Sequence, residues 1–499
     1  MEAVGQLDLS GLYAAYRADG QGQAPYDPAV MLGLLFYCYL KGIRSARKVA
    51  AACVDDVGCR VIAGGTLPSH QAFAVFFRRH RPQVKAMFVQ VLLLCAAEGL
   101  VQGHACAVDG SPVSADAALS ANVDGARLAA QITALEAALA AAAEAFMAGA
   151  DQPAGLAPGH GDEDRDGDEG RDGDEGRDGD EGRDGDEDGG DDQDSDRWPR
   201  RLTAMAARLG RLRAAQQVLA ARVAASADGT PAENARSAVA HLEQRLAEAS
   251  AAQDAKWEAY QAKVAAGTRG KGKPVAPAAT AAWVTRIRDA LEKARARLEA
   301  ALDRAAASAV KVNTTDPGSR VLPGKNGGYL QGRNLQLAAV RNQVLLAIGL
   351  HDNPADVGAL IPMIEESVRN CQLTGLEQQI RAWLADSGYA SAANFAALNH
   401  LLLLVSVRAE AAQTGRTTEA AAVPAGWEAM ASRLATPAGK KLYRRRSRLV
   451  EPAFAQFFAM FGRYLNYRGD AAGDEVQFLG AVHNLGKLLS HRRRQLSTA

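Results

Sequence analysis

The first hundred residues alternate apolar runs with the start and stop signals of short helices. Pro28 fits the first turn of a helix whose apolar run ends at Gly42. Ser69 stands where an N-cap is expected, and another apolar run follows Pro82. These patterns predict four or five short helices in an all-α N-terminal domain over residues 1–100, which fits a DNA-binding or dimerising module or a plain helical bundle.

A central insertion, residues 124–310, has a different pattern in Ala-, Arg- and Glu-rich sequence. Apolar residues recur there at steps of three and four, which places them on one face of long helices. The positions that carry this spacing are Leu128, Ile132, Leu135, Leu139, Leu202, Met205, Leu209, Leu212, Val284, Ile287, Leu291 and Leu298. Antiparallel coiled-coil hairpins would bury such stripes most simply, so we expect an inserted α-helical coiled coil.

Residues 161–196 of this insertion contain the repeated hexad RDGDEG, which has no apolar side chain. Such a segment cannot offset its own conformational entropy, so it is predicted to be disordered. Asp162, Asp164 and Asp166 match the opening of a calcium-binding loop, but Gly173 stands where the bidentate glutamate is required. The sequence therefore favours a solvated acidic linker over a calcium site.

Patterns typical of β-strands appear in residues 101–123 and again after residue 311. The predicted strands are 104–108, 335–340, 344–350 and 401–407, and the predicted helices are 376–383, 391–399, 450–467 and 475–490. Residues 341–343 separate the second and third strands and predict a hairpin. These elements indicate an α/β domain whose first part, 101–123, is separated by the insertion from its remainder, 311–499.

Charge is segregated along the chain although the formal net charge is zero. Acidic residues concentrate in 162–196, whereas cationic clusters stand at 78–81, 444–448 and 492–494. Without the acidic block the chain would be clearly basic, as expected for a nucleic-acid partner. Its 499 residues, 48% of them hydrophobic, indicate a soluble protein of two or three domains.

The cysteines and the apolar stretches bear on the compartment. The six cysteines form no CxxC pair, so we expect small buried side chains in a reducing cytosol. The N-terminus lacks the pattern of a signal peptide. The apolar stretches 30–40 and 88–97 are too short to span a bilayer, which takes roughly 20 residues. We expect a cytoplasmic, nucleoid-associated protein with no membrane association.

Three of the many Asp and Glu residues have settings that suit a metal site, although composition alone cannot select them. Asp109 follows the predicted strand 104–108 in an Asp-Gly-Ser-Pro turn, Asp386 follows another probable strand end, and Glu451 begins a predicted helix after a basic stretch. Mg²⁺ prefers hard oxygen ligands, so carboxylates on separate elements of one layer suit a two-metal phosphodiester site. Each also has a plainer explanation, because Asp-Gly is a common turn and Glu451 would favour a helix start.

Several stretches spread over the chain resemble bacterial insertion-sequence transposases of the DDE type. They are YCYLKGIRSARKVAAAC, LPSHQAFAVFFRRH, AVDGSPVSADAALSAN, NTTDPGSRVLPGKNGGYLQGRNLQLAAV, DNPADVGALIPMIEE, LADSGYASAANF, YRRRSRLVEPAFAQFF and FLGAVHNLGKLL. The chain is similar to the branch with a helical N-terminal domain, a ribonuclease H-like catalytic domain and a coiled-coil insertion after the first catalytic strand. The resemblance implies Asp109, Asp386 and Glu451 as the catalytic, metal-binding trio with Mg²⁺ or Mn²⁺.

The resemblance also implies the activity and the partners. Such enzymes hydrolyse a phosphodiester at each end of the element and then transfer the freed 3′-hydroxyl into target DNA. The expected partners are double-stranded DNA, both terminal inverted repeats and target, and further copies of the chain in a homodimer or higher oligomer. The DNA-binding candidates are Arg78 and Arg79 in the N-terminal domain and Tyr443, Arg444, Arg445, Arg446 and Arg448 before Glu451.

Two departures from the family pattern keep other functions open. Phe458 stands where a lysine is usual, and Ser447 stands where an arginine is expected one turn before the glutamate. A catalytically impaired DNA-binding or scaffolding protein derived from a transposase is therefore the alternative, and a nuclease without strand transfer is a third possibility. Gln331 and Asn334 lie in a matching stretch, but the resemblance assigns them no role.

Overall fold

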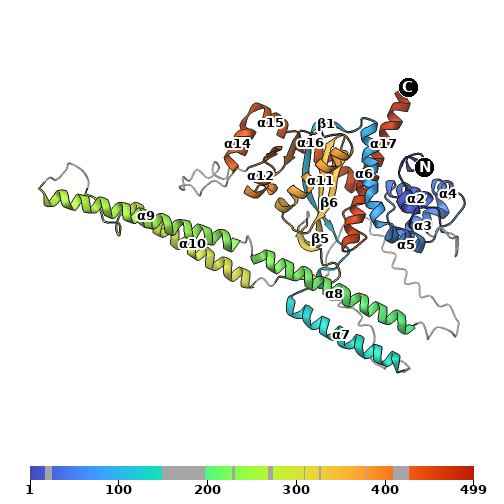
Figure 1. The fold of residues 1–499 in the computed structure, drawn as a ribbon, viewed down its shortest axis with the longest axis horizontal. Helices are drawn as coiled ribbons and strands as arrows, with labels where there is room; N and C mark the ends of the chain where they lie inside the picture. The colour runs from blue at the N-terminus through green and yellow to red at the C-terminus, as the bar shows by residue number, and fades with distance from the viewer. Residues whose placement is uncertain are drawn as a thin grey trace. The chain divides into compact units, whose positions relative to one another are not determined.

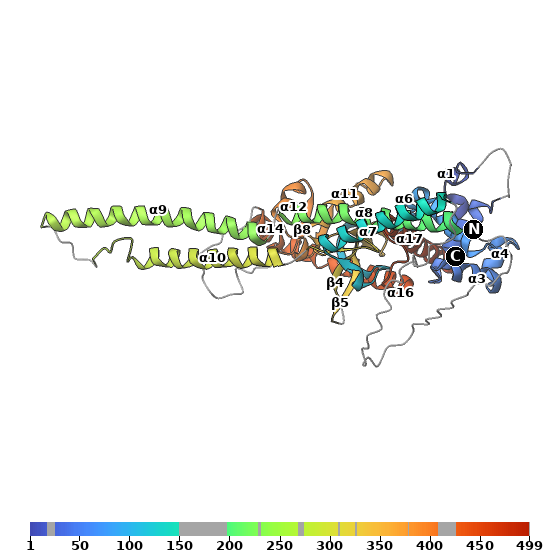
Figure 2. The same cartoon turned by 90° about the horizontal axis from the view of Figure 1, so that it is seen from below.

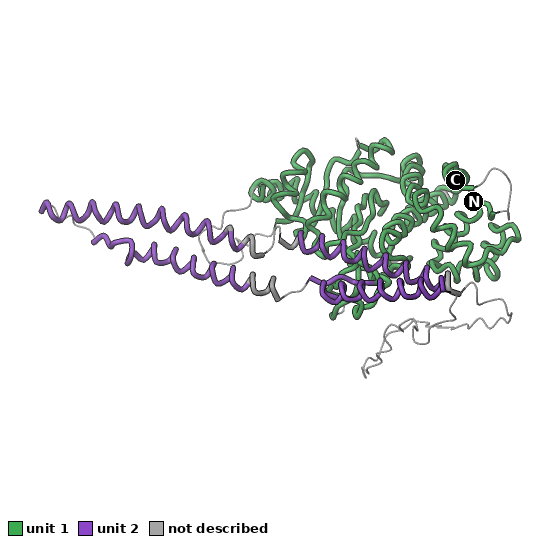
Figure 3. Tube along the Cα trace, turned by 60° about the horizontal axis from the view of Figure 1, so that its bottom comes forward, with its two compact units in different colours: residues 1–122, 315–499 green, residues 123–314 purple. Residues whose placement is uncertain are grey.

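The computed structural model describes residues 1–16, 25–148, 197–227, 231–267, 274–307, 310–324, 327–377, 379–407 and 426–498. Their contacts form two compact units, one of residues 1–122 with 315–499 and one of residues 123–314 (Figure 3). The acidic repeat at 161–196 lies outside the described residues, so its disorder stays a prediction.

The N-terminal part of the first unit is helical, as its start and stop signals predict. Its helices are η1 (Val4–Gln6), α1 (Ser10–Tyr13), α2 (Pro28–Leu40), α3 (Ala46–Asp55), α4 (Val57–Ala63), α5 (His70–Arg79) and α6 (Arg81–Ala97). Pro28 occupies the first turn of α2, and the Ser69 hydroxyl caps α5 by accepting from the Ala72 N–H at 3.2 Å. All six cysteines are buried and free, which confirms their place in the core.

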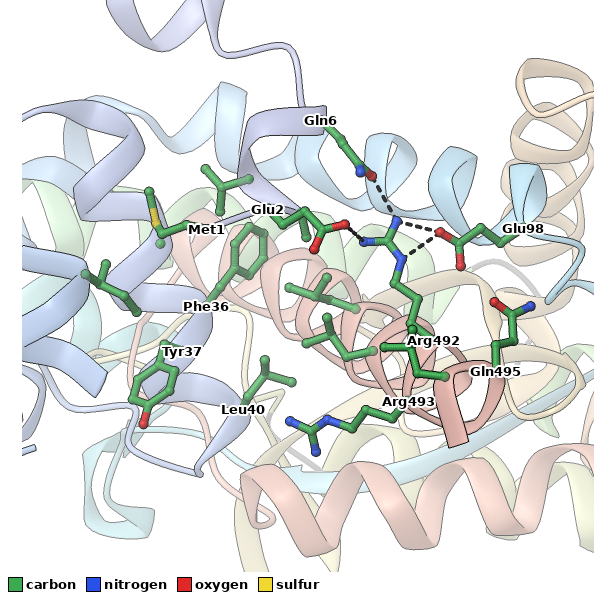
Figure 4. Close-up of a pocket in the computed structure, with 17 residues that line it drawn as sticks. Met1, Glu2, Gln6, Phe36, Tyr37, Leu40, Glu98, Arg492, Arg493 and Gln495 are labelled. Atoms are coloured by element: carbon green, nitrogen blue, oxygen red, sulfur yellow. Dashed lines mark hydrogen bonds and ion pairs between the residues drawn. The ribbon is translucent and has the colours of Figure 1, made fainter. Parts of the chain in front are cut away.

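These helices share one hydrophobic core with the C-terminal part of the chain. The helix α6 runs beside α17 (Asp470–Thr498) in Figure 1, and the rings of Phe36 and Phe478 stack with centroids 5.1 Å apart. Near the end of α17, Arg492 binds Glu2, Gln6 and Glu98 (Figure 4). The N-terminal helices therefore belong to the same compact unit as the sheet described next.

The first unit is built on a mixed six-stranded sheet. Its strands are β1 (Gln102–Ser114), β4 (Arg320–Pro323), β5 (Tyr329–Arg341), β6 (Leu345–His351), β7 (Ala382–Ala385) and β8 (Leu402–Val405). The strand β5 pairs antiparallel with β1, β4 and β6, whereas β1, β7 and β8 run parallel. The predicted hairpin is confirmed, and Asn342 and Gln343 make its turn with φ values of 65° and 57°.

Helices lie between and after these strands. They are η3 (Asp356–Ala359), α11 (Leu360–Leu373), η4 (Ser387–Tyr389), α12 (Ala392–Ala397), α14 (Trp427–Ala435), α15 (Pro437–Tyr443), α16 (Arg446–Phe461) and α17. The predicted strand at 401–407 and the predicted helix at 391–399 are present as β8 and α12, each somewhat shorter than expected. The predicted helices at 450–467 and 475–490 are present as α16 and α17 with different ends.

One face of the sheet carries Asp109. The register pairs Asp109 with Leu337 and Leu337 with Ile348, so these three side chains share a face. The helix α16 reaches this face, because Arg446 contacts Asp109. The helix α17 reaches it too, since a Cβ at Gly480 would lie 2.6 Å from the Ile348 side chain.

The opposite face carries the next residue of each strand. Gly110 pairs with Gln336 and Gln336 with Gly349, and α11 covers this face, where the sulfur of Met363 lies 3.9 Å from a Cβ built at Gly349. The two faces of β1 therefore contact different helices. The Asp109 face meets α16 and α17, and the Gly110 face meets the side covered by α11.

The strand β1 is longer than predicted and corrects the setting of Asp109. The Asp-Gly-Ser-Pro segment is not a turn, because it continues the strand and pairs with β5 as far as Ser114. Pro112 is tolerated because β7 pairs only with residues 105–107, which leaves that side of β1 without a ladder partner at the proline. Asp109 thus lies within a strand, at the level where β7 ends.

Two further predictions at the C-terminal end were wrong. The described residues 376–377 and 379–383 form no helix, because their last part is drawn into β7 by parallel pairing with β1. Glu451 does not begin a helix: α16 starts at Arg446, so Glu451 lies in its second turn and Pro452 lies inside it. The helix begins four residues earlier than its apolar pattern indicates, because its first turn starts with the polar residues Arg446, Ser447 and Arg448.

The second unit consists mainly of helices. They are α7 (Gly125–Met147), α8 (Arg197–Ala227), α9 (Pro231–Ala265) and α10 (Ala282–Ala307), with β2 (Asn122–Val123) and β3 (Val312–Asn313) pairing where the unit begins and ends. The helices form two antiparallel pairs, α7 with α8 and α9 with α10 (Figure 2). Leu128, Ile132, Leu209 and Leu212 are buried between α7 and α8, as their spacing predicts. A coiled-coil supercoil stays a prediction, and α9 was not foreseen.

The helix α7 has one further property. Among the residues that the structure describes, it alone is long and apolar enough to cross a membrane, judged by length and composition. Its Leu128 and Ile132 are buried against α8, and Glu136 pairs with Arg213 at 2.8 Å. These contacts pair α7 with α8, and the absence of membrane association stays a prediction.

A buried ion pair joins the N-terminal helices to the C-terminal part. Arg44 lies 2.6 Å from Glu475, and their side chains are 1% and 0% exposed. Arg44 also donates to the backbone oxygens of Phe461 and Tyr464, and Glu475 accepts from the Asn466 N–H. Burial raises the pKa of the Glu475 carboxyl, and Arg44 opposes that shift.

Replacing Arg44 by Met should therefore destabilise the protein strongly. The substitution leaves a buried carboxylate without its cation, which typically costs about 3–5 kcal/mol. Urea unfolding measures the loss, with Arg369→Met as control, because Arg369 and Glu366 form an exposed pair worth about 1 kcal/mol or less. Equal losses in the two variants would show that the Arg44 pair does not hold these parts together.

Candidate functional site

Asp109 lies within β1, and Asp386 lies directly after the end of β7. The parallel register pairs Ala105 with Ala382 and Ala107 with Leu384. Continuing this register by two residues brings Asp386 to the level of Asp109, and the charge of Asp386 acts on the Asp109 carboxyl. Parallel pairing thus brings together two residues that are far apart in the sequence.

Each aspartate has a defined local partner. The Asp386 carboxylate caps η4 and accepts from the Gly388 N–H at 2.8 Å. Arg446, in the first turn of α16, donates through Nη1 to the Asp109 Oδ2 at 3.1 Å, and the two side chains are 18% and 20% exposed. Tyr443 at the end of α15 donates its hydroxyl to the Ala385 carbonyl at 3.2 Å. The basic stretch is therefore fixed against both strand ends.

The electrostatics of Asp109 are unusual for an aspartate. Burial raises the pKa of its carboxyl to about 6, the neighbouring Arg446 opposes this, and the negative Asp386 adds to it. Burial also raises the pKa of Tyr389 far above its usual range, with Asp356, Asp109 and Asp386 adding to the effect. Two carboxylates crowded in a partly buried site fit a cation, because it would relieve their repulsion.

Glu451 is not part of this carboxylate pair. Its side chain is exposed in the second turn of α16. It shares a helical face with Phe458, seven residues on, and Arg463 stacks on Phe458 while donating to the Ser111 hydroxyl at 3.1 Å. Ser111 follows Asp109 on the same face of β1. The Glu451 face of α16 thus runs along the strand that carries Asp109.

The predicted trio is accordingly assembled only in part. The structure brings Asp109 and Asp386 together, whereas among the described residues no hydrogen bond or ion pair joins Glu451 to either aspartate. In the described part of the chain, no group of three or more Asp, Glu, His or Cys side chains is arranged to hold a metal ion. A ligand set that includes Glu451 would require its side chain to turn along α16 toward the pair.

The sequence analysis missed Asp356, whereas Arg463 was foreseen only as a neighbour that could compensate for the missing lysine and arginine. Asp356 opens η3 and accepts from the amides of Asn334 and Gln336, each at 2.8 Å, beside the backbone of Gly110. Its segment matched the family, but nothing in its spacing pointed to the site. The guanidinium of Arg463 lies 3.7 Å from the Phe458 ring centroid, so it provides a cation next to the position where a lysine was expected.

The DNA-binding candidates fall into two groups. Arg446 and Tyr443 are engaged at the strand ends, as described above. The remaining candidates are exposed: Arg78 and Arg79 on α5, and Arg444, Arg445 and Arg448 around the junction of α15 and α16. Arg79 also lies 5.3 Å from the ring centroid of Tyr16. The exposed guanidinium groups are available for an anionic partner, whereas the Arg446 guanidinium is bound to the Asp109 carboxylate.

Comparisons with known proteins give one match. Residues 5–79 match a family model described as a transposase domain (DUF772). No curated protein and no solved structure matches the chain. The match covers the N-terminal helices and supports membership of a transposase family, and hence in general terms a role as a DNA-cleaving enzyme.

The raised pKa of Asp109 predicts a pH-dependent stability. The window runs from pH 3.8, the ordinary pKa of the Asp109 carboxyl, to about 6, its pKa in the folded protein. At pH values within this window, the folded protein binds more protons than the unfolded chain. The free energy of unfolding should therefore fall as pH rises through this window, by up to about 3 kcal/mol at roughly 1.4 kcal/mol per pKa unit. Asp109→Asn cannot ionise and should escape that loss.

Urea unfolding in EDTA at pH 4 and pH 7.5 measures the effect. At each pH, the free energy of unfolding of the wild type is subtracted from that of Asp109→Asn. This difference should be larger at pH 7.5 than at pH 4. Comparing one variant at two pH values cancels any constant cost of the substitution. A difference between variant and wild type that is the same at both pH values would contradict the raised pKa.

Proposed function

We propose that the protein is a DNA transposase that hydrolyses phosphodiester bonds at the ends of a mobile element and transfers the freed 3′-hydroxyl into target DNA. The observation that carries this proposal is the proximity of Asp109, on β1, to Asp386, directly after the parallel strand β7, where the charge of Asp386 raises the pKa of Asp109 further. The transposase-domain match over residues 5–79 supports it independently. The mixed sheet, with helices on both faces, is compatible with the ribonuclease H-like layer that the sequence resemblance implies.

The proposed cofactor is Mg²⁺ or Mn²⁺. Two such ions, when bound, would supply the Lewis acidity that activates the attacking oxygen and stabilises the leaving one. Asp109 and Asp386 would hold the metal, with Glu451 joining from α16. The raised pKa of Asp109 supports this assignment, because a site that penalises two adjacent negative charges gains most when a cation enters.

The basic groups would take two different roles. Arg446 holds the Asp109 carboxylate in place and offsets part of its charge. The exposed arginines Arg444, Arg445 and Arg448 would contact phosphate oxygens of the element end, and such contacts fix position without reading sequence. Arg78 and Arg79 on α5 would contribute further backbone contacts from the N-terminal helices.

DNA cleavage by the purified protein tests the proposal. With Mg²⁺ it should cut DNA that carries the terminal inverted repeats. Asp109→Ala, Asp386→Ala and Glu451→Ala should each lower the rate by more than about 100-fold, since even the groups that orient a metal ligand contribute about 10–100-fold. Asp352→Ala is the matched control, because the Asp352 side chain is 73% exposed and outside the pair. Full activity in all three variants would refute the assignment.

A catalytically impaired DNA-binding protein is the second candidate. Two observations favour it: the described residues contain no assembled three-ligand metal cluster, and Phe458 replaces the expected lysine. Such a protein would bind inverted-repeat DNA and yet remain inert with both Mg²⁺ and Mn²⁺. Strand nicking by the wild type would exclude it, and nicking without joined products would indicate a nuclease.

The second unit is proposed to align two copies of the chain. The pairing of β2 with β3 brings the start and the end of the insertion together, so a short linker can replace residues 124–310. If the helix pairs hold the oligomer, this deletion should reduce the mass measured by light scattering to that of one chain. An unchanged oligomeric state would assign association to the first unit instead.

A further inference from the structure

Asp356 lies on the face of the sheet opposite Asp109, yet it contacts the backbone beside both site aspartates. Its Oδ1 accepts from the Asn334 Nδ2 and from the Gln336 Nε2, each at 2.8 Å. A carboxylate oxygen accepts hydrogen bonds, so it fixes which end of each amide points toward it.

The orientation of Gln336 passes to Tyr389 and so to Asp386. With its NH₂ group turned toward Asp356, the Gln336 carbonyl oxygen accepts the hydrogen bond that the Tyr389 hydroxyl donates. Tyr389 is fully buried and is the last residue of η4, which begins directly after Asp386. The Asp356 carboxylate thus determines which atom of Gln336 accepts from the Tyr389 hydroxyl. Tyr389 in turn belongs to the turn formed by Asp386 and η4, called the Asp386 turn below.

A second tie joins the same two segments. The Asn394 Nδ2 donates to the Val357 carbonyl at 2.7 Å and to the Tyr389 carbonyl at 2.8 Å. Val357 follows Asp356 in η3, so the backbones of η3 and η4 are bridged by one buried amide. The segment that carries Asp356 and the turn after Asp386 therefore form one connected unit.

Glycines stand where the Asp356 carboxylate approaches the backbone. A Cβ at Gly110, directly after Asp109, would lie 2.3 Å from the Asp356 Oδ1, which no real contact permits. A Cβ at Gly388, two residues after Asp386, would lie 3.3 Å from the Asp356 Oδ2. Neither glycine has a positive φ, so the close approach explains them.

We propose that Asp356 is a positioning residue that holds the backbone beside Asp109 and the turn after Asp386, so that the two carboxylates keep their mutual placement. It acts through hydrogen bonds and packing rather than as a ligand or a reacting group. The expected effect of Asp356 on DNA cleavage rests on the proposed function, whereas its expected effect on the stability of the Asp386 turn does not.

Hydrogen exchange of the Asp386 turn tests the proposal without relying on activity. The Gly388 and Tyr389 amides bond to the Asp386 side chain and carbonyl, so their exchange reports on this turn. Asp356→Ala removes both accepted hydrogen bonds and should raise their exchange rates about 10-fold. Asp356→Asn keeps an oxygen acceptor and should stay within about 3-fold of the wild type. Exchange in Asp356→Ala at the wild-type rate would overturn the proposal.

Two further variants keep the test decisive. Asp352→Asn, four residues earlier and exposed, is the matched control and should leave the exchange unchanged. Tyr389→Phe removes only the hydrogen bond at the end of the network and should raise the exchange by about 3-fold even if Asp356→Ala does not fold. Exchange in Tyr389→Phe at the wild-type rate would show that the network does not hold the turn.

DNA cleavage separates positioning from direct metal binding. At a temperature where all variants are folded, Asp356→Ala should lower the cleavage rate and raise the Mg²⁺ concentration needed for half-maximal rate, and Asp356→Asn should restore both. Equal loss in Asp356→Asn and Asp356→Ala would make the charge itself essential and overturn the positioning role. An inactive wild type would refute the proposed function, and the exchange measurement would still decide the role of Asp356.

Discussion

The close approach of two carboxylates, one within β1 and one directly after β7, is the constraint on which the rest of the structure depends. Parallel pairing of β1 with β7 brings Asp386 to the level of Asp109, and the partial burial of Asp109 makes the two negative charges costly. One guanidinium, that of Arg446, offsets part of this cost. The arrangement is unfavourable for stability alone, which is typical of sites that bind or react.

The surrounding structure limits how far these strand ends can move. The Arg44–Glu475 ion pair and the shared hydrophobic core connect the N-terminal helices to α17, and α17 packs on the same sheet. On the other face, the network of Asp356, Gln336 and Tyr389 supports the backbone that follows each aspartate. Both sides of the sheet thus contribute to the placement of one pair of carboxylates.

Local signals in the sequence were sufficient for much of the fold. The caps and prolines located the N-terminal helices, the three-four spacing located three helices of the insertion, and the β-rich runs located the hairpin. Asp109 and Asp386 were found through a family resemblance, because composition and spacing could not select them among the other acidic residues. The proximity of the two aspartates became clear only from the register of β1 and β7 in the structure.

The errors arose where tertiary contacts decide the structure. Residues 376–383 have helical character, but pairing with β1 draws their end into β7. The start of α16 was misplaced because its first turn begins with the polar residues Arg446, Ser447 and Arg448. The role of Asp356 depends on partners some 20 residues earlier and on a strand more than 200 residues away, so no local pattern could reveal it.

A crystal structure with bound Mn²⁺ tests the central claim most directly. The anomalous signal of Mn²⁺ should lie between Asp109 and Asp386, at about 2.0–2.6 Å from an oxygen of each, as is usual for hard divalent cations. Saturating Mn²⁺ with no signal between these carboxylates, and with Arg446 still bound to Asp109, would contradict the claim that this pair is a metal site.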